Sequence, residues 1–458
     1  MAKDPKRFKK ILIANRGEIA LRVIRTCREM RIPTVAVYSE ADEESLHVKL
    51  ADEAYCIGPA PAKESYLNMP AILSACEVSG ADAIHPGYGF LSENADFNEM
   101  CRSHGITFIG PSPDAVRRMG DKAEAKRTLR EAKVSVIPGS KEVITDIDAA
   151  EKVVKEMGYP VIVKATAGGG GRGMRVIQNH FELESQIQTA KQEALAAFGN
   201  GEIYIEKYIG EPRHIEIQVI ADRQGNVVHL GERDCSIQRR HQKLIEEAPS
   251  PAVDEKLRLR MGDAAIRAVK AVHYEGVGTV EFLLEPNGQF YFMEMNTRLQ
   301  VEHCVTEMVT GIDLVREQIM VAMGERLSFK QNQVQIRGHA IEFRINAEDP
   351  RNNFAPCPGT LTLWHPPGGF GVRLDSHAYA GYRIPPNYDS MIGKLIVWGA
   401  TRAEAMSRAK RALDEFIVEG VKTVIPLHML ILNNAFYRQG TFATNFIQRR
   451  INLLDLAE

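Results

Sequence analysis

The first 110 residues alternate short apolar runs with segments of helical spacing. Four runs are apolar enough to predict buried strands: 9–14, 34–38, 83–84 and 107–109. Between the first two, residues 17–30 form a helix pattern with these apolar residues on one side: Ile19, Val23, Ile24 and Cys27. Strand, helix and strand at this spacing predict a parallel α/β sheet. Gly-Pro-Ser-Pro at 110–113 ends the unit, so we expect a first domain over residues 1–113.

The middle of the chain changes from helical spacing to strands. Residues 114 to about 135 have helical spacing, which Val-Ile-Pro-Gly at 136–139 interrupts. A compact unit follows over 136–208, with an expected helix at 150–157 and strands at 161–164 and 174–177 around a glycine-rich loop. The later strand-like runs are 215–220, 227–230, 279–284 and 289–295, with a helix expected at 254–272. We expect a second domain over 114–333 that includes the 136–208 unit.

A third block begins near residue 334. It has strand patterns near 337–345 and 392–398 and a helix pattern near 402–418. This mixture predicts an α+β domain over 334–458. No internal repeat or low-complexity tract is visible along the chain.

Composition places the chain among ordinary globular proteins. It has 458 residues, 44% hydrophobic and 25% charged, which suits two to four domains. The net charge of −2 gives no basic field for nucleic acid or an anionic membrane. The basic start, Lys3 to Lys10, precedes only four apolar residues, too few for a signal peptide, and no apolar run approaches the roughly 20 residues that span a bilayer.

Seven cysteines are scattered along the chain without a Cys-x-x-Cys pair. This pattern predicts buried free thiols in a reducing compartment and therefore a cytoplasmic protein, with neither a disulfide framework nor a zinc site.

The richest chemistry lies between Phe290 and His303. Polar residues recur at every second position: Glu294, Asn296, Arg298, Gln300 and Glu302. In an extended backbone they would share one face, opposite the alternate residues Met293, Met295, Thr297, Leu299 and Val301. The carboxylate and amide oxygens suit a hard cation such as Mg²⁺, the guanidinium suits a planar oxyanion, and the last glutamate could act as a base. The alternative is a solvated strand face.

One further acid strengthens the metal hypothesis. Glu281 interrupts an apolar strand, and buried acids are rare unless paired or bound to metal. Glu281 and Glu294 on neighbouring strands could together ligate Mg²⁺.

The glycine-rich loop at 164–173 is a candidate phosphate loop. Gly168, Gly170 and Gly173 match Gly-x-Gly-x-x-Gly, but a strand pattern follows where a dinucleotide site needs a helix. The loop also lacks the Gly-Lys-Ser/Thr ending of a Walker loop. We interpret it as a mobile flap over a nucleotide, the alternative being a flexible surface loop.

Basic residues give a second phosphate signal. Lys122 and Lys164 lie where an element meets a turn, and residues 239–243 form a basic cluster. Each alone could be a solvated charge, and the cluster could be a surface salt-bridge patch.

Taken together, these segments resemble biotin carboxylase, an ATP-grasp enzyme of the biotin-dependent carboxylases, from about Phe8 to about residue 450. The motifs that carry the resemblance are ANRGEIA (14–20), HPGYGFLSEN (85–94), MGDK (119–122), KATAGGGGRGM (164–174), EKYI (206–209), PRHIEIQV (212–219), ERDCSIQRRHQK (232–243), EMNTRLQVEH (294–303), EFRINAEDP around Arg344 and YDSMIGKL (388–395). The resemblance implies an ATP-grasp fold with an N-terminal parallel α/β domain, a mobile glycine-rich lid and a C-terminal α+β domain.

The resemblance also implies a role for each matching position. The expected ATP contacts are Lys122, Lys164, Gly170, Gly171, Glu206, Lys207, Tyr208, Ile209, His214, His241, Glu281 and Glu294, and Glu206 to Ile209 would hold adenine largely through backbone groups. Glu281 and Glu294, helped by Asn296, would bind Mg²⁺ or Mn²⁺. The expected bicarbonate ligands are Lys243, Arg298, Gln300 and the backbone of Val301. Glu302 would deprotonate bicarbonate, and Arg344 would stabilise the biotin enolate.

The implied reaction is the carboxylation of biotin through carboxyphosphate, the first half-reaction of a biotin-dependent carboxylase. The sequence has no Met-Lys-Met biotin-attachment motif, so biotin is expected on a separate carrier protein, with the carboxyltransferase also on another chain. The family implies a homodimer. The acceptor stays open among acetyl-CoA, another acyl-CoA, pyruvate and 2-oxoglutarate.

Two other interpretations compete with this one: a non-catalytic ATP-grasp regulatory protein, and an ATP-grasp ligase for another carboxylate. The complete set of Lys243, Arg298, Glu302 and Arg344 argues against the first. If turnover requires bicarbonate, the second interpretation, a ligase for another carboxylate, is excluded. Cys304 departs from the family, where proline or threonine is frequent, and its role is open between packing and a thiol near the site.

Overall fold

The N-terminal part is a parallel α/β layer, as the sequence predicts. The computed structural model describes residues 7–140, 142–166 and 174–456. Five parallel strands in the order β3-β2-β1-β4-β5 form its sheet: β1 (Ile11–Ile13), β2 (Thr34–Tyr38), β3 (Glu53–Cys56), β4 (Ala83–His85) and β5 (Thr107–Phe108). Its helices are α1 (Gly17–Glu29), α2 (Leu46–Leu50), α3 (Met69–Ser79) and α4 (Ala95–Ser103). The four apolar residues predicted on one side of α1 are all buried.

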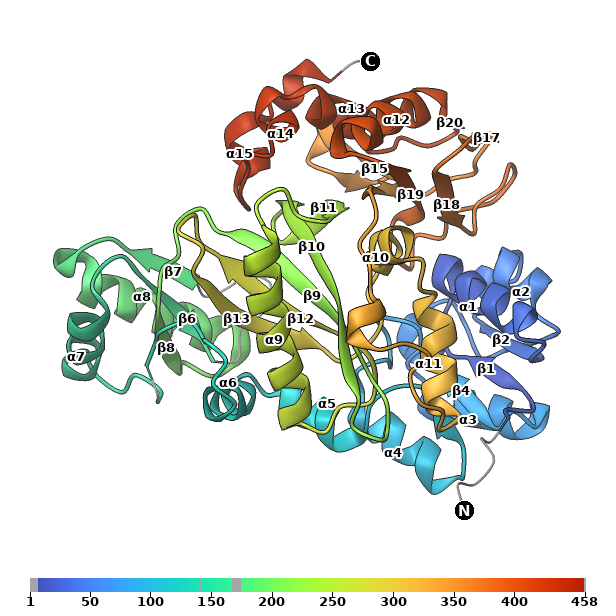
Figure 1. The fold of residues 1–458 in the computed structure, drawn as a ribbon, viewed down its shortest axis with the longest axis horizontal. Helices are drawn as coiled ribbons and strands as arrows, with labels where there is room; N and C mark the ends of the chain where they lie inside the picture. Colours follow the sequence, from blue (N-terminus) through green and yellow to red (C-terminus); the bar gives the residue numbers. More distant parts are fainter. Residues whose placement is uncertain (1–6, 141, 167–173, 457–458) are drawn as a thin grey trace.

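A small unit forms the left side of the molecule in Figure 1. Helices α5 (Pro113–Gly120) and α6 (Lys122–Glu131) lead into it. Its antiparallel sheet has the order β7-β6-β8, and its elements are α7 (Ile147–Met157), β6 (Val161–Ala165), β7 (Met174–Ile177), α8 (His180–Phe198) and β8 (Ile203–Lys207). A strand does follow the glycine-rich loop, so the structure contradicts a dinucleotide-binding turn there.

One eight-stranded sheet forms the centre of the molecule, in the order β13-β12-β9-β10-β11-β14-β19-β18. Its strands are β9 (Arg213–Ala221), β10 (Val227–Arg239), β11 (Gln242–Ala248), β12 (Gly276–Leu284), β13 (Phe290–Asn296), β14 (His339–Asn346), β18 (Val372–Ser376) and β19 (Met391–Gly399). β11 and β14 pair antiparallel, so the expected boundary at 334 separates chain segments that share a sheet. The division into three domains stays a prediction.

Helices cover both ends of this sheet. α9 (Glu255–Ala271) shares an apolar core with β9, β12 and β13, and α12 (Arg402–Glu415) and α13 (Ile425–Asn433) share another with β14 and β19. The other elements are α10 (His303–Thr310), α11 (Leu314–Ala322), β15 (Glu348–Asp349), β16 (Ala355–Pro356), β17 (Leu363–His365), β20 (Ile417–Glu419), α14 (Ala435–Arg438) and α15 (Phe446–Arg450). α10 contacts β10, β11, β14 and β19, which places the residues just before it over the middle of the sheet (Figure 1).

Three expectations need correction. The extended segment expected from 290 to 302 ends at Asn296, because Glu93 of the N-terminal part accepts hydrogen bonds from Thr297 and Arg298 and turns the chain. The helix expected to 418 ends at Glu415, and a strand follows it. Cys56 is exposed, since it ends the edge strand β3, and Cys357 is half-buried, although all seven cysteines are free.

None of the helices in the described ranges is long and apolar enough to cross a bilayer.

Candidate active site

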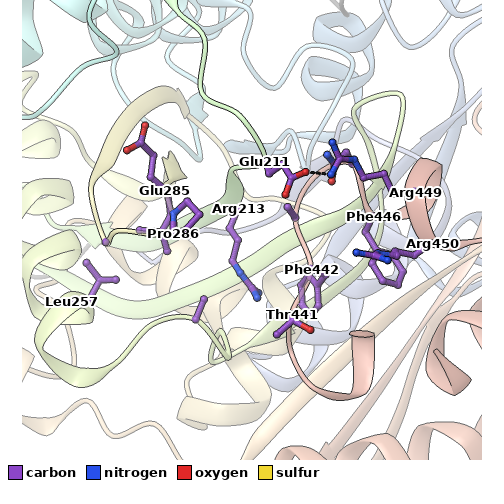
Figure 2. A pocket seen from close by; sticks show the side chains of 15 residues that line it. Glu211, Arg213, Leu257, Glu285, Pro286, Thr441, Phe442, Phe446, Arg449 and Arg450 are labelled. Carbon is purple, nitrogen blue, oxygen red and sulfur yellow. Dashed lines mark hydrogen bonds and ion pairs between the residues drawn. The ribbon is translucent and has the colours of Figure 1, made fainter. Parts of the chain in front are cut away.

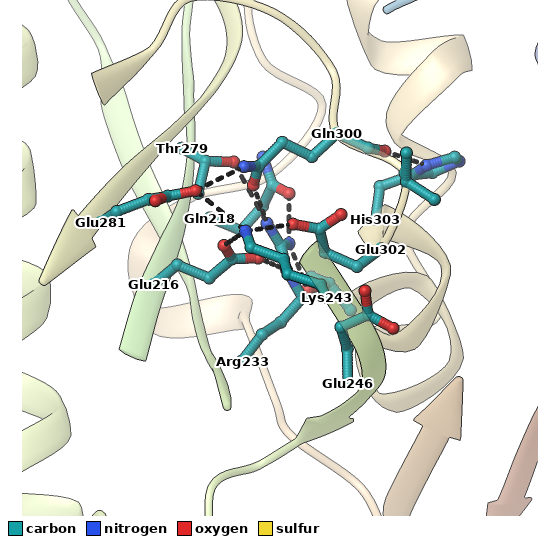
Figure 3. A network of polar contacts seen from close by, with 12 residues as sticks. Glu216, Gln218, Arg233, Lys243, Glu246, Thr279, Glu281, Gln300, Glu302 and His303 are labelled. Carbon is teal, nitrogen blue, oxygen red and sulfur yellow. Dashed lines mark hydrogen bonds and ion pairs between the residues drawn. The ribbon is translucent and has the colours of Figure 1, made fainter. Parts of the chain in front are cut away.

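Lys243 stands at the centre of a buried polar network that five elements build (Figure 3). It lies on β11, and its ammonium donates to Glu216 Oε2 at 2.7 Å, Glu281 Oε1 at 2.9 Å and Glu302 Oε1 at 2.6 Å. Glu216 is on β9, Glu281 on β12 and Glu302 directly before α10. Burial opposes the charge, but the three carboxylates outweigh it and raise the pKa of Lys243 well above its usual value. Lys243 is therefore a fixed cation.

Glu281 and Glu294 lie on the neighbouring strands β12 and β13, as predicted, and the register places them directly opposite each other. Glu281 Oε1 accepts hydrogen bonds from Lys243, Asn296 and Gln300, whereas Oε2 accepts one from His214 at 2.8 Å. Burial would raise the pKa of Glu281, but Lys243 and His214 hold it well below its usual range. Glu281 is therefore ionised.

Glu294 has the opposite electrostatic setting. Its side chain remains in contact with solvent. Even so, partial desolvation by the surrounding protein and the charge of Glu281 raise its pKa. A divalent cation would relieve this repulsion, and two carboxylates beside an amide oxygen are the donor set that Mg²⁺ or Mn²⁺ prefers. Glu281 Oε1 already accepts three donors, whereas Oε2 accepts only one, from His214, so Oε2 is the less occupied oxygen.

Arg233 on β10 binds several members of this network, and sequence reasoning missed it. The guanidinium is fully buried, and it pairs with Glu216 and donates to Gln218 at 2.5 Å, Thr306 at 2.9 Å, Thr279 at 3.1 Å and Gln300 at 2.8 Å. Figure 3 shows Arg233 reaching into the centre of the network near Glu216, Gln218 and Lys243. Nearly all of β10 is buried, so no alternation of polar and apolar residues distinguishes Arg233 in the sequence.

Glu302 is held between two cations. Its Oε1 accepts from Lys243 at 2.6 Å, and its Oε2 accepts from Arg344 of β14 at 2.9 Å. Burial favours the neutral acid, but Lys243, Arg344 and Arg233 outweigh it and hold the pKa of Glu302 far below its usual range. The carboxylate is thus ionised, as a base must be, and is strongly stabilised in that form.

The remaining bicarbonate candidates lie in the turn from Asn296 to Glu302. Arg298 donates to Glu93 at 2.9 Å and to Asn296 at 3.0 Å, and it remains partly exposed. Gln300 bridges Arg233 and Glu281. The carbonyl of Val301 accepts from Lys394 of β19 at 2.8 Å. This buried lysine also pairs with Glu18 at 3.0 Å, and sequence reasoning missed its role in fixing the turn.

A second cluster joins the β7-β6-β8 unit to α6. Glu206 is buried and pairs with Lys164 at 2.6 Å and with Lys126, which sequence reasoning also missed. Burial would raise the pKa of Glu206, but Lys164 and Lys126 lower it. Lys207 and Tyr208 follow, and their backbone amides donate to the carbonyls of Pro138 and Pro160. Ile209 is buried.

The other described residues singled out from the sequence lie outside these two clusters. Lys122 is the exposed first residue of α6 and adds positive charge near Glu294. His241 is exposed in the turn between β10 and β11. Gly168, Gly170, Gly171 and Gly173 lie outside the described residues. Cys304 is buried in α10 and donates to Asp375 at 3.2 Å, and burial raises the pKa of its thiol, which favours packing over chemistry.

A cavity of about 440 Å³ lies elsewhere, where residues 441–450 meet the start of β9 and the β12–β13 turn (Figure 2). Three of its charged residues already have partners: Glu211 pairs with Arg449, and Arg213 donates to Asp234 at 2.9 Å and lies 4.3 Å from the Phe442 ring centre. None of the network residues around Lys243 lines it. The Lys243 network is therefore the better candidate for chemistry.

Three family models match the chain in order. They describe the biotin carboxylase N-terminal domain over residues 7–116, the ATP-binding domain of the carbamoyl-phosphate synthase L chain over 121–330, and the biotin carboxylase C-terminal domain over 342–449.

Individual relatives match almost end to end. Biotin carboxylase 1 of Bacillus subtilis is 59% identical over 96% of this chain and 98% of its own. A biotin carboxylase structure from Campylobacter jejuni, in complex with β-γ-ATP, has a TM-score of 0.92 and 54% identity over 97% of this chain and 99% of its own. The biotin carboxylase domain dimer of 2-oxoglutarate carboxylase from Hydrogenobacter thermophilus, in complex with MgADP, ADP and bicarbonate, has a TM-score of 0.91 and 49% identity, covering 98% of this chain and 99% of its own. On the shared fold and on sequence identity over nearly its whole length, this chain belongs to the biotin carboxylase family.

Proposed function

We propose that this chain catalyses the ATP- and bicarbonate-dependent carboxylation of biotin. The observation that carries the proposal is the position of Glu302, an ionised carboxylate between Lys243 and Arg344 and one bridging lysine away from Glu281. A base, an oxyanion-binding cation and the carboxylates for a nucleotide-bound metal are thus contiguous. This combination suits bicarbonate activation by ATP better than amide ligation.

Bicarbonate would bind among Lys243, Arg298 and Gln300, with Glu302 held beside it by Lys243. It is a poor nucleophile, so removing its proton helps it attack the γ-phosphoryl group of ATP. Lys243 and Arg344 hold the pKa of Glu302 low in the absence of substrate. When bicarbonate draws either cation toward itself, Glu302 loses part of that stabilisation and gains proton affinity. Substrate binding therefore activates the base.

Glu281 and Glu294, with Asn296 beside them, would hold the metal. A divalent cation bound there neutralises charge on the ATP phosphates during phosphoryl transfer. For this purpose the chain holds Glu281 ionised through Lys243 and His214. Lys164 and Lys122 would add positive charge around the nucleotide, and residues 206–209 would hold the adenine.

Biotin would react beside Arg344. Carboxyphosphate releases CO₂ and phosphate, the phosphate takes the ureido proton, and the biotin enolate attacks CO₂. Arg344 is partly buried, which opposes its charge, but Glu246 and Glu302 outweigh this and raise the pKa of the guanidinium, so that it stays charged. A fixed guanidinium is suited to stabilise the enolate oxygen.

We further propose that biotin arrives on a separate carrier protein and passes its carboxyl group to a carboxyltransferase on another chain. A homodimer is supported by the relative from Hydrogenobacter thermophilus, which is described as a dimer. A cytoplasmic location is supported by the seven free cysteines.

The test is the transfer of label from radioactive bicarbonate to free biotin in the presence of MgATP. Label in acid-labile carboxybiotin with the parent, and none with Glu302→Gln, supports the proposal. Equal labelling by both proteins would exclude Glu302 as the base, and no labelling by either, with ATP still cleaved, would indicate another ATP-grasp ligase.

A further inference from the structure

Two glutamates lie side by side on neighbouring strands next to Arg344. Glu246 on β11 and Glu342 on β14 are directly opposite each other in the antiparallel register. Directly opposite residues project from the same face, with Cβ atoms about 5 Å apart. Both side chains are fully buried. Two like charges so placed destabilise a sheet unless a cation or a proton separates them.

The cations nearby are already paired. Arg344 donates to Glu246 Oε1 at 2.6 Å and to Glu302 at 2.9 Å, and Lys394 pairs with Glu18 at 3.0 Å. In the described structure neither oxygen of Glu342 has a hydrogen-bond partner, and Glu246 Oε2 has none either. A buried carboxylate without partners is strongly destabilising, and protonation removes that penalty.

The surroundings of Glu342 give no other source of charge balance. Ala340, two residues earlier on the same face, packs with Cys304, Val305 and Val309 of α10, so α10 covers this part of the sheet. The charged and titratable groups that face the pair are Arg344 on β14, Lys394 on β19, Lys243 on β11, Glu302 and Cys304 at the start of α10, Cys235 on β10 and, beyond Lys394, Glu18 on α1.

We propose that Glu246 and Glu342 hold one proton between them, carried by Glu342, and that this proton keeps Arg344 in position for biotin. Glu246 alone then attracts Arg344, and the guanidinium can still reach Glu302 and the enolate. If both acids were ionised, their combined charge would pull Arg344 toward the pair and away from the reacting atoms. Glu342 is thus a positioning residue, and its role rests on the proposed function of Arg344.

The electrostatics agree with the geometry. Burial, opposed in part by Arg344 and aided by Glu302, raises the pKa of Glu246 to about 7. Burial and the charge of Glu246, opposed by Lys394 and Arg344, raise the pKa of Glu342 well above its usual value. The pair titrates as one unit, so its second ionisation is displaced to higher pH.

A first experiment detects the proton without turnover. Infrared spectra of the substrate-free protein at pH 7 are compared among the parent, Glu342→Gln and Glu419→Gln, an exposed glutamate that serves as the control. We expect the parent and the control to show the carbonyl stretch of a protonated carboxylic acid, shifted in D₂O, and Glu342→Gln to lack it. Glu342→Met is a second variant that removes the acid. A band of equal intensity in the parent and in either Glu342 variant would overturn the proposal.

A second experiment measures the effect on Arg344. We expect kcat for biotin carboxylation to fall at alkaline pH in the parent as the pair loses its proton. In Glu342→Gln this fall should move up by at least about one pH unit, because an amide cannot ionise. At pH 7, Glu246→Gln should lower kcat on the order of tenfold more than Glu342→Gln does, because it removes the carboxylate that holds Arg344.

An unchanged alkaline fall in Glu342→Gln, or equal losses in the two variants, would overturn the positioning role. Absence of carboxylation by the parent with the infrared band present would instead contradict the proposed function.

Discussion

Replacing Arg233 with methionine removes the cation at the base of the active-site network while keeping a side chain of similar length. Arg233 pairs with Glu216 and donates to four further acceptors, on Gln218, Thr279, Gln300 and Thr306. In Arg233→Met all of these acceptors lose a donor inside the protein. Glu216 keeps only Lys243, at 2.7 Å.

The expected loss follows from burial. Arg233 and Glu216 are both fully buried, so the variant leaves a carboxylate with half of its compensating charge. Removing one partner of a buried pair costs about 3–5 kcal/mol of unfolding free energy. The separate hydrogen bonds would add to more, but they act as one unit and their losses are not additive. Gln300 also loses the donor that orients it toward Glu281, so bicarbonate should bind more weakly.

The assay is equilibrium urea unfolding followed by circular dichroism, beside the KM for bicarbonate. Arg117→Met is the matched control, because Arg117 also pairs with two carboxylates, Asp96 and Glu99, but at the surface. We expect the control to unfold near the parent midpoint, since exposed pairs contribute little. Adding Glu216→Gln to Arg233→Met should restore part of the loss by removing a carboxylate that has lost half of its compensating charge.

The reasoning would be refuted if Arg233→Met unfolded at the same urea concentration as Arg117→Met. It would also be refuted if Glu216→Gln destabilised the parent and Arg233→Met by the same amount, because the two residues would then not be coupled.

Three further predictions concern individual glutamates and Arg344. Glu302→Gln should lower bicarbonate-dependent ATP cleavage by roughly 10²–10⁴-fold while nucleotide binding survives, and normal turnover would exclude the base role. Arg344→Ala should reduce biotin carboxylation far more than ADP binding; equal losses would make the residue structural. Glu247 is fully buried, and although burial opposes it, His339 and Arg402 lower its pKa from 4.5 to about 2. A depressed carboxyl pKa gives stability that is present above the unfolded-state value and lost as pH falls, here about 3 kcal/mol between pH 4.5 and 2. Glu247→Gln should flatten this part of the stability profile, and an unchanged slope would show that other groups dominate.

The sequence predicts elements best where one face of an element is buried. The apolar side of α1 follows from a period of 3.6 residues, and the placement of Glu281 and Glu294 on neighbouring strands follows from an acid that interrupts an apolar strand. The turn from Asn296 to Glu302 does not follow from the sequence pattern. Its alternation suggests a strand through Glu302, but the ladder ends at Asn296, because Glu93, some 200 residues earlier, captures Thr297 and Arg298. A local pattern carries no information about such a distant partner.

The residues that hold the site together were also invisible in the sequence. Arg233 and Lys394 lie within strands that are buried almost throughout, so nothing local separates them from a surface charge. Their roles depend on which carboxylates the topology brings to them. The pairing of β11 with β14 places Arg344 beside Glu302, and this contact joins residues on either side of the expected domain boundary.

The central claim is that ATP cleavage is coupled to bicarbonate and biotin. Its most direct test is ADP release by the purified protein with MgATP and free biotin, with and without bicarbonate. We predict release that requires both bicarbonate and biotin. Release that is indifferent to bicarbonate would contradict the account and indicate a different ATP-grasp ligase.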